Sequence, residues 1–267
     1  MKIPFTKAHG ARNDFLLTWA SQAPRENLPS VARAICDRHA GVGADGWLLV
    51  KPAGPETPGC HGSIRLFNAD GSEAEISGNG TRCAAAFLID AGLARDAVSI
   101  LTGAGVKHLR LIERRELHFR FEMNMGRPAG PGERVRLELS SGPADVTVMD
   151  VGNPQCALLV EEFPAHWRAL AAEIEGHPFF PRRTNVSLVK VVDRHTLEVR
   201  FFERGVGETM SSGTGSTGAF VAAVQAGLAE TPVTVVTPAG PLELRWEGEI
   251  YLTGPAEIVA GGEFYLE

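Results

Sequence analysis

Two serines stand at matching positions in two copies of one glycine-rich motif. Ser77 begins the sequence Ser-Gly-Asn-Gly, Ser212 begins Ser-Gly-Thr-Gly, and an alanine-rich apolar run follows each. A phenylalanine and a glutamate repeat at the same offset along the chain, as the pairs Phe67 and Phe202, and Glu73 and Glu208. The apolar runs predict helices, and a helix N-terminus binds anions through free backbone N–H groups and its dipole. The repeat therefore predicts a pseudo-symmetric protein that holds one anionic ligand between its halves.

Each polar feature of the chain also has a simpler interpretation. A single Ser-Gly-x-Gly sequence is most often an ordinary helix N-cap. Asn13, Asn153 and Asn185 lie in predicted turns next to strands, where asparagine commonly bonds to the local backbone. Glu203 and Arg204 could form a surface ion pair of small value. Taken together, however, amide, guanidinium and backbone N–H donors around two helix ends favour a ligand with carboxylates and an amine.

The composition is that of a globular protein, and it narrows the classes of partner. The chain has 267 residues, of which 44% are hydrophobic and 22% charged, with a formal net charge of −6. No basic block is present, which argues against nucleic acid or an anionic membrane as a partner. No apolar run reaches about 18 residues, and the first residues lack the apolar segment of a signal peptide. A cytoplasmic protein is therefore expected.

The sequence predicts neither a metal site nor a disulfide framework. The four cysteines match no zinc-binding spacing and are expected to be reduced thiols: Cys36, Cys60, Cys83 and Cys156. His39 and His177 have no acidic or cysteine partner at a ligand spacing, so both are expected to be structural or surface residues.

Hydrophobic periodicity and turn residues predict an α/β (α+β) fold in which strands outnumber helices. Helices are expected at residues 29–38, 80–91, 164–174 and 215–229, and the chain is expected to end with strands at 233–237, 242–246, 249–253 and 256–260. Each half has one long apolar helix, which favours a curved, mainly antiparallel sheet or barrel around it. We expect two similar domains, residues 1–120 and 121–258, with residues 259–267 returning to the first.

Longer motifs make the sequence similar to one known family. They include His9-Gly10-x-x-Asn13-Asp14-Phe15, Cys36-Asp37-Arg38-His39-x-Gly41-Val42-Gly43-Ala44-Asp45, Phe67-Asn68-Ala69-Asp70-Gly71-Ser72-Glu73, Gly78-Asn79-Gly80-x-Arg82-Cys83, Gly152-Asn153-Pro154, Arg183-Thr184-Asn185-Val186, Glu203-Arg204-Gly205-x-Gly207-Glu208-Thr209, Gly213-Thr214-Gly215 and Leu252-Thr253-Gly254-Pro255-Ala256. In this order, and over nearly the whole chain, they resemble diaminopimelate epimerase.

The resemblance implies a cofactor-independent amino-acid epimerase with two mirrored α/β domains and its site in the cleft between them. Such an enzyme interconverts LL- and meso-diaminopimelate in lysine and peptidoglycan synthesis. One cysteine removes the α-proton and a second returns a proton to the opposite face, because inversion without a cofactor needs acid/base groups on both sides of one carbon. The resemblance also makes a homodimer a candidate assembly.

The family's site residues can be placed on this sequence motif by motif. The catalytic positions fall on Ser77 and Ser212, with Glu203 supporting one of them. The implied substrate contacts are Asn13, Asn68, Gly78, Asn79, Asn153, Asn185, Glu203, Arg204, Gly213 and Thr214.

Four positions depart from the family pattern. Ser77 and Ser212 replace the two catalytic cysteines, Gln155 replaces a histidine, and Gly46 replaces a glutamine. A hydroxyl is a far weaker acid than a thiol, and a helix dipole worth about 1–2 kcal/mol does not close that gap. We therefore expect the family function with weak or no activity.

Three interpretations of the two serines stay open. The chain could be a double Cys→Ser variant of an epimerase. It could be a relative that acts on another amino or hydroxy acid as a racemase, isomerase or dehydratase. It could also be a non-catalytic amino-acid-binding protein.

Overall fold

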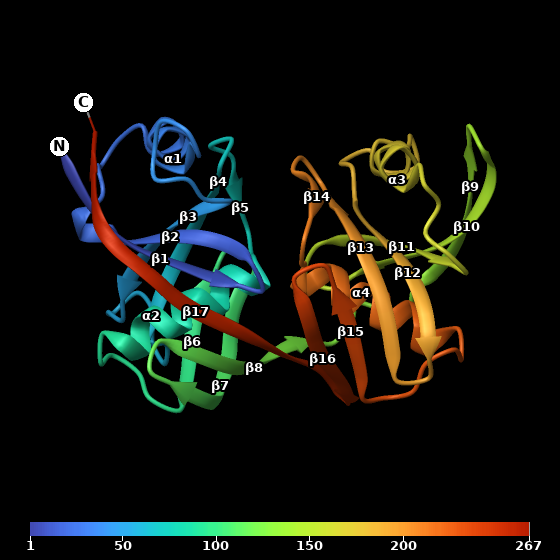
Figure 1. Ribbon diagram of the computed structural model, residues 1–267. Coiled ribbons are helices and arrows are strands. Elements are labelled where there is room, and N and C mark those ends of the chain that lie inside the picture. The colour runs from blue at the N-terminus through green and yellow to red at the C-terminus, as the bar shows by residue number, and fades with distance from the viewer. Residues whose placement is uncertain (267) are drawn as a thin grey trace. The chain divides into compact units, whose positions relative to one another are not determined.

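The computed structural model describes residues 1–266, and its internal contacts divide the chain into two units (Figure 1). The first unit contains Met1–Met123 together with the residues from Gly254 onward, and the second contains Asn124–Thr253. Two strands, β8 (His118–Gly126) and β17 (Glu249–Tyr265), have residues in both units. Among residues 1–266, no helix combines the length and apolar character that crossing a membrane requires.

The first unit is a ring of strands around one helix. Its other strands are β1 (Lys2–Gly10), β2 (Asn13–Trp19), β3 (Gly46–Pro52), β4 (Gly62–Asn68), β5 (Glu73–Ala74), β6 (Ala97–Thr102) and β7 (Gly105–Arg115). Its helices are the short 3-10 helix η1 (Ala20–Gln22), α1 (Leu28–Cys36) and α2 (Gly78–Asp90).

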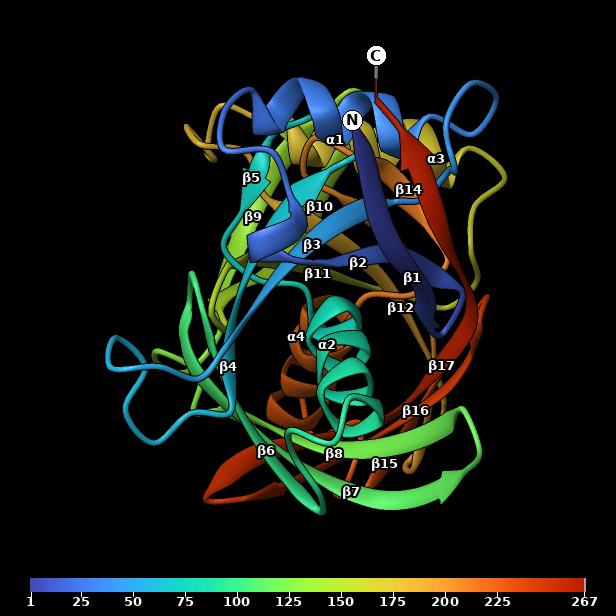
Figure 2. The same cartoon turned by 90° about the vertical axis from the view of Figure 1, so that its left-hand side faces the viewer.

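The strand pairing closes this ring. β1 pairs with β2, β2 with β3, β3 with β4, β4 with β6, β6 with β7, and β7 with β8. β8 also pairs with β17, which returns to β1. Closure pairs the edges that an open sheet would expose. The strands surround α2 (Figure 2). Every residue of α2 from Gly78 to Ile89 is buried.

The second unit repeats this plan. Its strands are β9 (Glu133–Leu139), β10 (Gly142–Asp150), β11 (Pro154–Val160), β12 (Asn185–Asp193), β13 (Thr196–Glu203), β14 (Gly207–Thr209), β15 (Val233–Thr237) and β16 (Gly240–Glu247), and its helices are α3 (Trp167–Glu175) and α4 (Gly213–Gln225). α4 packs against β10, β11, β12, β13, β15 and β16 of its own unit, as α2 packs against the strands of the first. Residues Gly213 to Ala223 of α4 are buried.

The two units also share the order of strand directions. From β1 to β7 the successive pairings are antiparallel, parallel, antiparallel, parallel and antiparallel, with β5 outside this series. The pairings from β10 to β16 follow the same order, with β14 outside it. The repeated side chains occupy equivalent places, since Phe67 pairs with Glu73 and Phe202 with Glu208. The α/β class and the barrel around a central helix are thus confirmed.

Three details of the expected elements were wrong. Residues 133–146, which form β9 and the first part of β10, were not expected to be strands. The fourth long helix ends at Gln225, because Gly227 (φ +73°) terminates it instead of lying inside it. The last two expected strands are one strand, β17, which pairs with β16 as far as Thr253 and with β1 from Glu257 onward.

Candidate active site

The N-termini of α2 and α4 have almost the same geometry. Ser77 is the N-cap of α2 (φ −131°, ψ 124°), and its Oγ accepts a hydrogen bond of 3.1 Å from the backbone N–H of Gly80. Ser212 is the N-cap of α4 (φ −137°, ψ 123°), and its Oγ accepts a 3.1 Å bond from Gly215. Serine is a favoured cap because it satisfies one backbone donor of the first turn. Two matched, N–H-rich helix ends result, one in each unit.

The second glycine of each motif packs closely against the serine. A Cβ on Gly80 would lie 3.3 Å from the Cβ of Ser77, and a Cβ on Gly215 would lie 3.0 Å from that of Ser212. Gly215 also faces the ring of Phe201, which would be 2.8 Å from the added carbon. The Ser-Gly-x-Gly spacing therefore has a steric cause in both units.

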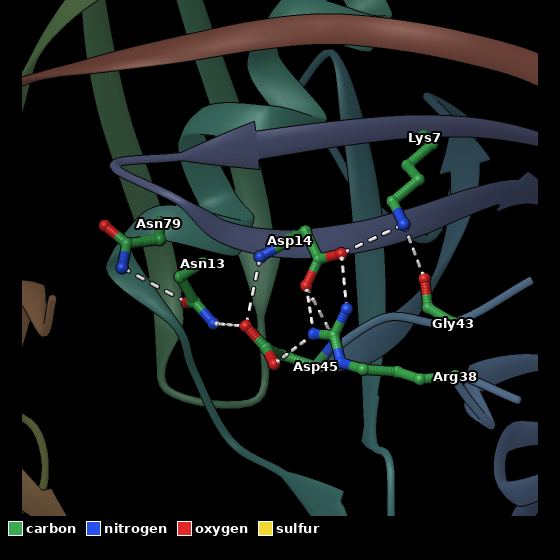
Figure 3. Close-up of polar contacts among 7 residues, drawn as sticks. All are labelled: Lys7, Asn13, Asp14, Arg38, Gly43, Asp45 and Asn79. Atoms are coloured by element: carbon green, nitrogen blue, oxygen red, sulfur yellow. Dashed lines mark hydrogen bonds and ion pairs between the residues drawn. The ribbon is translucent and has the colours of Figure 1, made fainter. Parts of the chain in front are cut away.

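In the first unit, two predicted substrate contacts form a chain of side-chain amides beside the α2 turn (Figure 3). The Nδ2 of Asn79 donates to the Oδ1 of Asn13 over 3.1 Å, and the Nδ2 of Asn13 donates to the Oδ2 of Asp45 over 2.7 Å. Asn79 belongs to the first turn of α2, whereas Asn13 begins β2. The fold thus brings together two residues that the sequence placed in separate motifs.

Asp45 belongs to a cluster of four charged side chains that anchors the hydrogen-bonded amides of Asn13 and Asn79 (Figure 3). Arg38 Nη2 donates to Asp14 and to Asp45, each over 2.7 Å, and Lys7 Nζ lies 3.1 Å from Asp14. Burial of Asp14 opposes its ionisation, but hydrogen bonds from Arg38 and Lys7 outweigh this effect, so its pKa lies below the ordinary value of 3.8. The same bond to Asp14 raises the pKa of Arg38 despite partial burial. The cluster fixes the loop before β3 against β1 and β2.

Asn13 is also positioned by a tight hairpin. Gly10 pairs with Asn13, and the two residues between them, Ala11 and Arg12, have φ values of +50° and +60°. This left-handed backbone matches the twist of a two-residue hairpin, where asparagine and glycine are usual. Ala11, buried and held in this conformation, stores conformational strain two residues before Asn13, a predicted site residue.

The second unit assembles four predicted substrate contacts. Asn153 Nδ2 donates to Thr214 Oγ1 over 3.3 Å, in the position that corresponds to the Asn13–Asn79 bond. Asn185 Nδ2 donates to the carbonyl of Pro154 over 2.8 Å, and its Oδ1 accepts from the backbone N–H of Arg204 over 3.1 Å. The α4 turn is thus joined to the ends of β11, β12 and β13.

Gln155 extends this second set of contacts. Its Nε2 donates to Asn153 Oδ1 over 2.7 Å, and the residue is 1% exposed. Its Oε1 is buried without a hydrogen-bond partner among residues 1–266. An added carbon on Gly218 of α4 would lie 3.1 Å from the Gln155 Cβ, so this glycine lets the helix approach β11 closely.

Gly46 lies at the start of β3. A Cβ there would meet the carbonyl oxygen of Phe67 at 2.9 Å and the side chains of Leu66 and Phe15 at 3.1 and 3.3 Å. The neighbouring strands leave no space at this position, so a larger side chain would require these surrounding residues to shift.

The remaining predicted contacts lie in turns or helix ends. Asn68 ends β4 and bonds within its own turn, where its Nδ2 donates to Ser72 Oγ over 3.0 Å. Glu203 ends β13 and pairs with Gly207. Gly78 and Gly213 are the first residues of α2 and α4, and both are buried.

Several supporting residues were not singled out from the sequence. They are Lys7, Asp14, Arg38, Asp45, Arg82 and Glu175. Glu175 is 1% exposed, pairs with Arg183, and accepts a 3.3 Å bond from the backbone N–H of Gly205. All but Lys7 and Glu175 lie inside the quoted family motifs, which was the available signal.

Comparison with known proteins places the chain in a family. The sequence model of diaminopimelate epimerase matches residues 5–129 and 147–259. The chain belongs to the diaminopimelate epimerase family. Diaminopimelate epimerase of Pelotomaculum thermopropionicum is 40% identical to it over 97% of this chain and 98% of the relative. Diaminopimelate epimerase 1 of a Nostoc species is 40% identical to it over 98% of this chain and 100% of the relative.

Solved structures share the fold of this diaminopimelate epimerase family member at low sequence identity. A hydroxyproline epimerase from Agrobacterium vitis superposes with a TM-score of 0.73 at 14% identity, covering 98% of this chain and 92% of that chain. A phenazine biosynthesis protein of the PhzF family from Bacillus anthracis gives a TM-score of 0.72 at 14% identity, with both chains fully covered. These similarities support the fold alone.

Three buried cysteines of this diaminopimelate epimerase family member, Cys36, Cys83 and Cys156, are poor acid/base groups. Burial raises the pKa of Cys83 to about 12 and that of Cys156 to about 12. Burial likewise raises the pKa of Cys36 to about 12, with a further contribution from the charge of Asp14. Cys83 is 0% exposed inside α2, in agreement with a packing role. Among residues 1–266, no cluster of three potential metal ligands was found.

Proposed function

We propose that this chain binds diaminopimelate and that Ser77 and Ser212 occupy its two proton-transfer positions. The proposal rests chiefly on one observation: both serines cap a buried helix with the same backbone geometry and the same 3.1 Å bond. Two-base epimerisation needs one acid/base group on each face of the α-carbon. One equivalent position in each unit would meet that need.

The substrate contacts proposed for this chain are residues with amide, guanidinium, carboxylate or backbone N–H groups. They are Asn13, Asn68, Gly78, Asn79, Asn153, Asn185, Glu203, Arg204, Gly213 and Thr214. The free N–H groups and positive ends of α2 and α4 suit the substrate carboxylate. Glu203 is proposed to support one of the two proton-transfer groups.

The reaction should be slow with hydroxyls at both positions. A serine hydroxyl is a weak general base, and neither Cys83 nor Cys156 is suited to replace a thiol at either turn because burial raises the pKa of each to about 12. Gln155 does not accept a proton as a histidine would. We therefore expect binding without efficient turnover.

Titration calorimetry with meso- and LL-diaminopimelate tests the binding directly. L-lysine is the matched control ligand, because it has the same α-amino acid and distal amine but lacks the distal carboxylate. We expect diaminopimelate to bind at least about tenfold more tightly than lysine, the effect of one charge-assisted bond. Absence of heat and of competition by either isomer would contradict diaminopimelate as the ligand.

A relative with another substrate is the second candidate function. The observation that favours it is the tight packing around Gly46, where a glutamine side chain has no room without a shift. Competition by a panel of amino and hydroxy acids distinguishes the two, because a better ligand without a second carboxylate would favour the altered substrate.

The assembly and compartment follow from the same proposal. We propose a homodimer acting in the cytoplasm, a reducing compartment that suits four free cysteines. Light scattering after size exclusion should give about twice the 28.6 kDa chain mass, and a monomer at micromolar concentration would contradict the dimer.

A further inference from the structure

The first unit has a buried cation that its counterpart lacks. Arg82, in the second turn of α2, is 0% exposed, and burial lowers its pKa to about 10. Its Nε donates to the carbonyl of Pro255 over 3.0 Å, and its Nη2 donates to Asn79 Oδ1. Both acceptors are neutral oxygens. Its Nη1 is buried without a hydrogen-bond partner among residues 1–266. Burying a guanidinium without a carboxylate partner costs free energy of folding. We therefore expect Arg82 to have a role that offsets this cost.

A chain of hydrogen bonds runs from Arg82 through Asn79 and Asn13 to Asp45. The chemistry of its two ends fixes the direction of every bond in it. A guanidinium only donates, so the Asn79 atom that faces Arg82 must be its oxygen. An ionised carboxylate only accepts, so the Asn13 atom that faces Asp45 must be its nitrogen. The remaining bond then has to run from Asn79 Nδ2 to Asn13 Oδ1, as Figure 3 shows. Neither side-chain amide can rotate by about 180°, which would exchange its oxygen and nitrogen, without breaking the hydrogen bonds at both of its ends.

The second unit lacks such an anchor. The position equivalent to Arg82 is Thr217, whose hydroxyl donates to the Gly213 carbonyl within its own helix over 2.9 Å. The Asn153–Thr214 bond of that unit is flanked by the amide of Gln155, a group that can either donate or accept. The amide orientation is therefore fixed from both ends only in the first unit.

We propose that Arg82 is a positioning residue that orients the Asn79 and Asn13 side-chain amides for the ligand of the α2 turn. Its effect on affinity rests on the function proposed above, whereas its effect on the amides does not. Arg82 lies in the second turn of α2 and acts through its hydrogen bond to Asn79. It is not proposed to contact the substrate.

The first test measures the amides in the ligand-free protein. Side-chain ¹H–¹⁵N resonances of Asn13 and Asn79 are assigned in the original chain, in Arg82→Met and in the control Thr217→Val. We expect Arg82→Met to shift the Asn13 amide, two side chains away, and to accelerate its hydrogen exchange, whereas Thr217→Val leaves it unchanged. An unchanged Asn13 amide in a folded Arg82→Met protein overturns the proposal. Arg82→Lys, which keeps a donor-only group, should retain part of the original spectrum, and it serves as the test if Arg82→Met does not fold.

The second test is a double-mutant cycle on diaminopimelate affinity. Arg82→Met should weaken binding roughly tenfold in the original chain, the fold-change of one oriented hydrogen bond. In an Asn79→Ala background the same substitution should change the dissociation constant less than about twofold. Equal effects in both backgrounds would show that Arg82 does not act through Asn79. If the original chain binds no diaminopimelate, the proposed function fails, and the amide spectra still decide the role of Arg82.

Discussion

The ion cluster beneath Asn13 should make a measurable, pH-dependent contribution to stability, which Asp14→Asn removes. The side chain of Asp14 is 14% exposed and receives bonds from Lys7, which is 24% exposed, and from Arg38, which is 53% exposed. The Lys7 contact should contribute about 1–1.5 kcal/mol, and the Arg38 contact about 0.5–1 kcal/mol after screening by solvent. We therefore expect Asp14→Asn to lower the free energy of unfolding by about 2 kcal/mol at pH 7.

The sign of the pH dependence follows from the lowered pKa of Asp14. The carboxylate is favoured in the folded state, so its stabilisation is complete above the ordinary value of 3.8 and is lost as the pH falls through the lower folded pKa. Urea unfolding of both proteins should therefore show a difference at pH 6 that shrinks at pH 3.

Asp145→Asn provides the matched control for Asp14→Asn. Asp145 lies 3.7 Å from Arg136, and both side chains are mostly exposed, at 73% and 65%. This substitution should change the free energy of unfolding by less than about 0.5 kcal/mol. A difference between the original chain and Asp14→Asn that is absent at pH 6, or that grows toward pH 3, would refute the reasoning.

Four further variants test the local geometry of the site. Gly215→Ala should destabilise the protein by about 1–3 kcal/mol in thermal unfolding, and Gly80→Ala by less, because its closest contact is 3.3 Å instead of 2.8 Å; equal effects would contradict the packing argument. Gly46→Gln should destabilise by a similar amount, and an unchanged melting temperature would mean that the strands open readily there. Ala11→Asn with Arg12→Gly should stabilise by about 1 kcal/mol by relieving the left-handed turn, and a loss of stability would contradict the strain.

Local sequence signals were sufficient for most of the fold. The two serine caps and their apolar helices could be predicted because capping chemistry and hydrophobic periodicity act over a few residues. The hairpin of Glu133–Leu139 and Gly142–Asp150 was missed although residues 134–139 alternate charged and apolar side chains, because the Pro- and Gly-rich residues 128–132 before it indicate a loop. β17 was divided at Gly254 and Pro255, although pairing with different strands on each side carries it through both residues.

The residues of the candidate site could be proposed from the sequence, but the hydrogen bonds that join them could not. The family motifs supplied Asn13 and Asn79, yet nothing local states that one donates to the other. That direction depends on Arg82 and Asp45, which approach from other elements of the fold. Partner choice among polar groups distant in sequence is a property of the packed structure.

Exchange of the α-proton of LL-diaminopimelate in D₂O tests the roles of Ser77 and Ser212 most directly, when it is followed by proton NMR with the original chain and with Ser77→Cys/Ser212→Cys. The single-cysteine variants are the matched controls, because inversion needs a group on both faces. We predict that the double variant exchanges and epimerises the substrate about 10²–10⁴-fold faster than the original chain, the usual range for general acid–base catalysis. A double variant that exchanges no faster, or an original chain that already turns over rapidly, would contradict the assignment of these two serines to the proton-transfer positions.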